Sequence, residues 1–71
     1  MPYAEAAHLR TAAMHERTAA THEQAAELFE AMGSHSLARK ERARARFERH
    51  GAVIEHELAR LRRDLIRANS R

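Results

Sequence analysis

The chain has 71 residues and a mass of 8.1 kDa, which is enough for one small domain. It contains no cysteine, so disulfides and thiolate metal sites are excluded. Its apolar runs are too short for a transmembrane helix or a secretory signal, so we expect a cytoplasmic protein. Of its 31 hydrophobic residues 16 are alanine, and this thin core predicts a chain that needs a partner.

The order of turn residues predicts an all-α protein made of one helical-hairpin domain over residues 1–71. A first helix is expected at about residues 2–32, with Pro2 in its first turn. The turn residues 33–36 follow, where Gly33 suits the left-handed position after a helix and Ser34 or Ser36 suits a cap. A second helix is expected at about residues 35–69. A short connection between two long helices predicts an antiparallel pair.

The first helix carries a seven-residue repeat, HLRTAAM, HERTAAT and HEQAAEL, over residues 8–28. On a helical wheel the histidines and the alanines at 12, 19 and 26 flank one wide stripe of apolar and small residues. This stripe is wider than one neighbouring helix can cover, which predicts that two hairpins form a dimeric four-helix bundle. The stripe comprises Ala4, Ala7, Thr11, Met14, Thr18, Thr21, Ala25, Leu28 and Met32.

Large apolar residues of the second helix also recur every seven positions, and they run straight through Gly51, so the helix is expected to continue there. A hairpin folded about position 34 sets Phe47 level with Thr21 and Ile54 level with Met14, so we expect large residues to meet small ones. Gly51 falls on the expected buried stripe, which predicts a close backbone approach. The predicted assembly residues are Met14, Leu28, Phe29, Met32, Leu37, Phe47, Gly51, Ile54, Leu58, Leu61 and Leu65.

Three of the six histidines, His8, His15 and His22, share one face of the first helix. Seven residues span about 10.5 Å, so no two of them can share a metal ion. Only Glu5 and His8 have the i, i+3 spacing found in di-iron carboxylate bundles, and Glu57 of the second helix is a candidate third ligand. The same residues could instead form a zinc site. The simpler interpretation needs no cofactor. It places the histidines half-buried against a partner helix, where they make assembly sensitive to pH.

Charge is uneven: residues 1–33 carry a net charge of −3 and residues 34–71 a net charge of +6. The first interpretation of the arginines is a solvated face that pairs with the acidic row Glu16, Glu23 and Glu30 of a neighbouring hairpin. The alternative is binding of DNA or RNA, although aromatic stacking residues are lacking. Membrane binding is disfavoured because the chain has no tryptophan. The arginine face comprises Arg39, Arg42, Arg46, Arg49, Arg60, Arg63 and Arg67.

Nothing in the sequence favours an enzyme. The serines lie in the turn and at the tail, and two glycines are too few for a phosphate-binding loop. A two-helix hairpin also offers no walled pocket. We therefore expect a non-enzymatic protein–protein interaction module that self-associates or joins a larger assembly, with polyanion binding and the metal site as alternatives.

Overall fold

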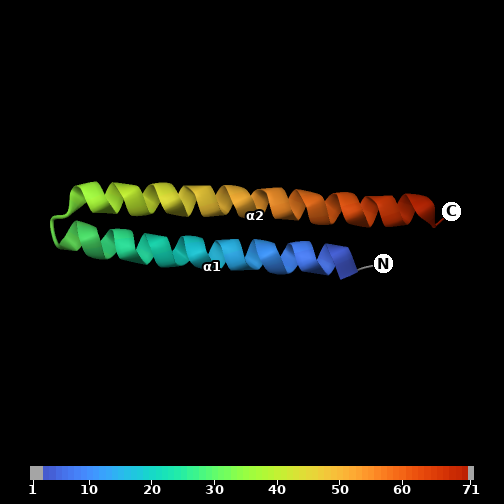
Figure 1. The fold of residues 1–71 in the computed structure, drawn as a ribbon, viewed down its shortest axis with the longest axis horizontal. Coiled ribbons are helices and arrows are strands. Elements are labelled where there is room, and N and C mark those ends of the chain that lie inside the picture. The colour runs from blue at the N-terminus through green and yellow to red at the C-terminus, as the bar shows by residue number, and fades with distance from the viewer. Residues whose placement is uncertain (1–2, 71) are drawn as a thin grey trace.

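The computed structural model describes residues 3–70, which form the helices α1 (Tyr3–Ala31) and α2 (His35–Asn69). The two helices run antiparallel side by side, so both ends of the chain lie at the same end of the hairpin (Figure 1). The rod measures 59 × 13 × 9 Å. The predicted all-α hairpin is confirmed, with helix bounds within about two residues of those expected. The predicted role of Pro2 falls outside the described residues.

The turn closes α1 with a Schellman motif. Gly33 has φ of +79°, the left-handed conformation that favours glycine. Its N–H donates to the carbonyl of Glu30 at 3.0 Å, and the N–H of Ser34 donates to the carbonyl of Phe29 at 2.8 Å. Ser34 is the N-cap residue of α2, as one of the two alternatives predicted, whereas Ser36 lies within the helix. The predicted capping bond from the serine hydroxyl is wrong, because the Ser34 side chain makes no such bond. Gly33 alone fixes the reversal of the chain.

The core between α1 and α2 consists of alanine. Seven residues within 3–70 are buried, and all of them are alanines spaced seven apart on each helix. Small side chains let two helix backbones approach closely, and a seven-residue spacing keeps them facing the partner helix. We call this row the alanine seam; it comprises Ala12, Ala19, Ala26, Ala38, Ala45, Ala52 and Ala59.

The predicted packing of large residues of α2 on small residues of α1 is wrong. Phe47 is 77% exposed, and Ile54 and Leu61 are also exposed. Phe47 is two residues past a seam alanine, about 200° around the helix, so it lies on the far side of α2. The reason is that alanine allows a closer approach of the backbones than interdigitated large side chains do. The continuation of α2 through Gly51 is confirmed. No helix of residues 3–70 is long and apolar enough to cross a bilayer.

Candidate functional site

A row of three histidine–carboxylate pairs runs along one side of the alanine seam. Five of the six partners follow a seam alanine by three residues, and His8 follows Glu5, which stands at the next seam position; this spacing places each partner about 60° from the seam on its own helix. The imidazole Nδ1 donates to the carboxylate in each pair, and all six side chains are half-buried, with at most 31% of their area exposed. The pairs are His8–Glu55 at 3.2 Å, His15–Glu48 at 2.6 Å and His22–Glu41 at 2.5 Å.

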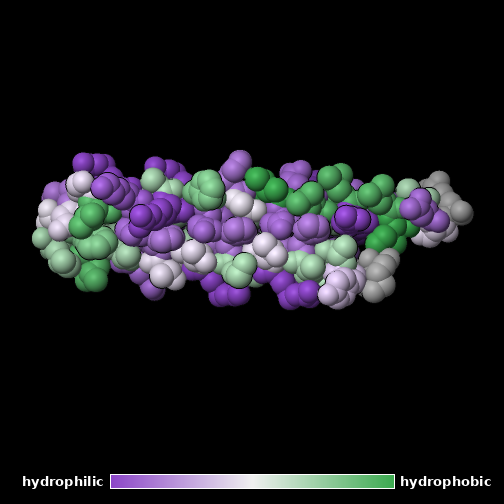
Figure 2. All heavy atoms as spheres, in the orientation of Figure 1, coloured by the Kyte–Doolittle hydropathy of each residue, from purple (hydrophilic) through white to green (hydrophobic). Residues whose placement is uncertain are grey.

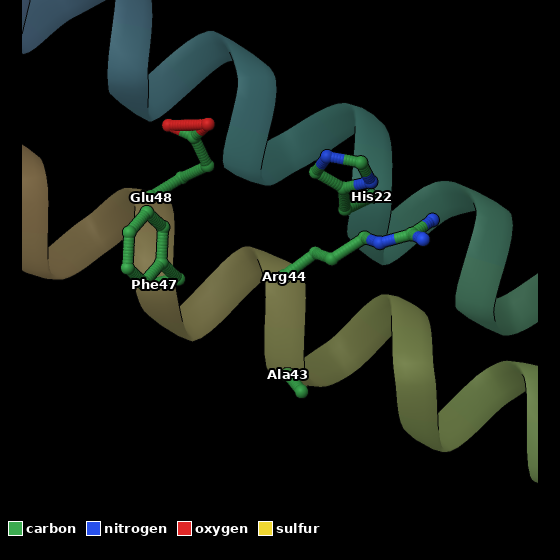
Figure 3. Close-up of a pocket in the computed structure, with 5 residues that line it drawn as sticks. All are labelled: His22, Ala43, Arg44, Phe47 and Glu48. Atoms are coloured by element: carbon green, nitrogen blue, oxygen red, sulfur yellow. The ribbon is translucent and has the colours of Figure 1, made fainter.

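Arg44 adds a cation at the turn end of this row. Its Nη1 donates to Glu41 at 3.0 Å, although the arginine itself stays exposed. The hydrogen bond from His22, with a smaller contribution from Arg44, lowers the pKa of Glu41 below its ordinary value. Beside it lies a groove of about 470 Å³ where Phe47 flanks Glu48 and His22 (Figure 3). The row therefore borders directly on exposed apolar surface.

A second row of pairs lies on the opposite side of the seam. Arg42 donates to Glu30 at 2.7 Å, and Arg49 donates to Glu23. The bond from Arg49 lowers the pKa of Glu23 and raises that of Arg49. His35 and then Arg42 lower the pKa of Glu30. Glu16 completes the row with His56 at 3.3 Å. The acidic row was expected to pair with another hairpin, but it pairs within its own, because the seam brings both rows to its edge.

The predicted arginine face is therefore divided in two. Arg42 and Arg49 are engaged in the pairs just described. The remaining five form no ion pair with any acidic side chain of residues 3–70, and all five are exposed. This second group comprises Arg39, Arg46, Arg60, Arg63 and Arg67. It is the part of the predicted face that remains accessible to a ligand.

The predicted metal ligands do not converge. His8 turns to Glu55, whereas Glu5 lines a shallow hollow with Arg60 and Arg63 on the other side of the seam. Glu57 is exposed. Across residues 3–70 no three histidine or carboxylate side chains form a group that could hold a metal ion.

Large apolar side chains are left exposed on both helices. Figure 2 shows them gathered over the C-terminal half of α2, beside a polar band that runs between the helices. Of the predicted assembly residues, Phe29 and Gly51 are half-buried. The others are exposed by 38% to 77%; they are Met14, Leu28, Met32, Leu37, Phe47, Ile54, Leu58, Leu61 and Leu65.

Gly51 does mark a close approach, but to a side chain. A Cβ at this position would lie 3.2 to 3.3 Å from three ring atoms of His15. The imidazole therefore reaches across from α1 and lies on the backbone of α2. Gly51 leaves room for the imidazole of His15, and the Nδ1 of this ring donates a hydrogen bond to Glu48.

The glutamates at 41, 48 and 55 are the residues whose role the sequence prediction missed. A signal for them exists, because Glu-Arg, Glu-Arg and Glu-His dipeptides recur every seven residues in α2 and mirror the His-Glu dipeptides of α1.

Comparison with known proteins finds no matching family model, no matching curated protein and no matching solved structure. Function is therefore inferred from these surfaces alone.

Proposed function

We propose that the protein is a non-enzymatic interaction module that self-associates, as a homodimer in which two hairpins make a four-helix bundle. The observation that carries the proposal is the exposure of the large apolar side chains. Phe47, Ile54, Leu58, Leu61 and Leu65 follow one another at steps of seven, four, three and four residues, which is the spacing of a coiled-coil seam. An exposed apolar row of this length on a small protein is typical of an association surface.

The accessible area supports a partner of about the size of a second copy. The hairpin exposes 5405 Å². A compact monomer of the same mass exposes about 4,500 Å², so the excess is about 900 Å² per chain. A standard interface buries about 800 Å² on each partner. The excess area therefore matches what one dimer interface covers.

Sedimentation equilibrium tests the proposal. A variant carrying Phe47→Gln, Ile54→Gln and Leu61→Gln removes apolar surface from the far side of α2, and it should sediment as a monomer where the wild type is a dimer. Val53→Gln is the matched control, because Val53 is 56% exposed but lies in the row of the accessible arginines. A wild type that remains a stably folded monomer at micromolar concentration would refute self-association.

Polyanion binding is the second candidate, and the five accessible arginines favour it. Four of them lie in one row at multiples of seven residues, with Val53 in the gap, and exposed arginines on one face suit the phosphates of DNA or RNA; such binding weakens steeply as salt is raised. Arg46→Glu combined with Arg60→Glu should abolish the shift of a labelled duplex or RNA at low salt. The control is Arg44→Glu, which changes a cation that already pairs with Glu41. No shift with the wild type would eliminate this candidate.

A further inference from the structure

The two faces of the hairpin differ in what surrounds the seam. On the side of the histidine–glutamate row, the next positions outward on α1 are alanine, threonine, methionine and leucine. On α2 the first row outward holds Leu37, Arg44, Gly51, Leu58 and Leu65, and the second row, towards the far side of the helix, holds Lys40, Phe47, Ile54 and Leu61. We call this side the histidine–glutamate face. On the opposite side the next positions outward carry the accessible arginines. Only the histidine–glutamate face therefore combines exposed apolar borders with few free charges.

The spacing of the three pairs suits a second copy of the chain. The pairs lie seven residues apart, about 10.5 Å along the rod, with His15–Glu48 in the middle. A two-fold axis through this middle pair sets each pair of one copy against a pair of the other, because the outer two exchange places. The exposed apolar borders on both helices meet in the same arrangement.

We infer that the second copy covers the histidine–glutamate face, so that the three pairs are sealed in the interface and uptake of protons by the histidines tightens the assembly. This inference rests on the proposed self-association. It also names the surface used and the condition that regulates it.

The charges on this face determine the direction of the pH effect. Glu41, Glu48 and Glu55 face the imidazoles from α2, with Arg44 next to Glu41 and Arg62 continuing the glutamate row beyond Glu55. Lys40, exposed in the row of Phe47, is the other cation at the border of this face. On α1 the rows outward of the histidines contain no charged residue, and Glu5, three residues before His8 in the seam row, lines the hollow with Arg60 and Arg63 on the opposite side. With neutral imidazoles, the carboxylates at 48 and 55 have no cationic partner on the face. Sealing an unpaired carboxylate from water is costly, whereas a protonated histidine makes the pair neutral.

The predicted dependence therefore has a maximum. Assembly should be tightest at a mildly acidic pH, where the imidazoles carry protons and the carboxylates do not. It should weaken at higher pH as the imidazoles lose their protons, and at lower pH as the carboxylates gain theirs. A group that is more readily protonated in the dimer makes association stronger as the pH falls, which is the sign required here.

The test is sedimentation equilibrium of the full chain at about pH 5.5 and about pH 8, on either side of the ordinary imidazole pKa. Circular dichroism at the same concentrations checks that the helices persist at both values. The dissociation constant of the wild type should be lower by at least about tenfold at the acidic value, as for one linked proton over one pH unit. A variant with His8→Gln, His15→Gln and His22→Gln should associate with equal strength at both values.

His56→Gln is the matched control, because it removes a histidine–glutamate pair from the opposite face, and it should keep the wild-type dependence. If the triple variant loses its helical signal, His15→Gln alone should reduce the dependence. Equal dissociation constants for the wild type at both pH values would overturn this inference and leave the proposed self-association standing. Absence of association at every pH would overturn both. Loss of the dependence in His56→Gln would also overturn the choice of face.

Discussion

The alanine seam makes a sharp prediction about overpacking. Ala19 is fully buried, whereas its neighbour Ala20 is exposed. Ala19→Leu inserts three extra carbons between two helices that are held close by alanine. Overpacking of this kind costs about 1 to 3 kcal/mol. A domain of this size loses about 4 to 8 °C in melting temperature per kcal/mol, so we expect a decrease of about 4 to 24 °C.

Ala20→Leu is the control, because it makes the same change in side chain on the same helix but outside the alanine seam. Both substitutions exchange alanine for leucine in the interior of the same helix, so both lose the same helix propensity, roughly 0.2 kcal/mol. We therefore expect Ala20→Leu to change the melting temperature by no more than about 2 °C. The difference between the two variants isolates the cost of separating the helices.

The assay is thermal unfolding followed by far-ultraviolet circular dichroism. All variants are compared at one protein concentration, because the proposed self-association would make the melting temperature depend on concentration. If the helices packed instead through Phe47 and Ile54, Ala19 would lie at the flank of the interface and a leucine there would be tolerated. Equal melting temperatures for Ala19→Leu and Ala20→Leu would refute the alanine seam.

Three further predictions concern single contacts. Because the pKa of Glu41 is lowered in the folded chain, its contribution to stability is present above about pH 4.5 and is lost as the pH falls further, so Glu41→Gln should flatten the acid limb of a melting profile. In a His15→Ala background, Gly51→Ala should raise the free energy of unfolding by about 1 kcal/mol through helix propensity. The gain should be smaller in the wild type, where the imidazole of His15 must move to make room for the new Cβ. Equal gains in the two backgrounds, measured by denaturant unfolding, would contradict this contact. Gly33→Ala should lower stability by about 1 kcal/mol in the same assay, since alanine disfavours positive φ; an unchanged midpoint would contradict the Schellman turn.

Helix positions and the turn could be predicted from the sequence because they depend on local signals. Gly33 is the strongest turn residue near the middle of the chain, and its positive φ gives it that role. The axial register of the two helices, that is, which residues of α1 and α2 lie side by side, could also be predicted, because a short turn fixes it. Ile54 was expected level with Met14, and the ring that lies against Gly51, one turn before Ile54 on α2, belongs to His15, the residue after Met14.

The rotation of the helices about their axes could not be predicted by ranking hydrophobicity. Phe47 and Ile54 make the most apolar row of α2, and that ranking placed them in the hairpin interface. Alanine rows score lower, yet they allow the closest backbone contact and bring charged rows together on both sides. His15 with Glu48, and Arg49 with Glu23, form only when the alanines face each other. The ion pairs between these charged rows, rather than the hydrophobicity of the apolar row, indicate how the two helices are rotated.

The alanine seam also explains why a chain with few large apolar residues leaves them exposed. The buried residues between α1 and α2 are all alanine, so no large apolar side chain of residues 3–70 is buried when the hairpin closes. Each buried alanine removes little apolar area from water, so the isolated hairpin gains little from its own core. In the proposed dimer Phe47 and its neighbours are covered, which would raise the stability of the hairpin and couple folding to association. The proposal therefore predicts a melting temperature that increases with protein concentration.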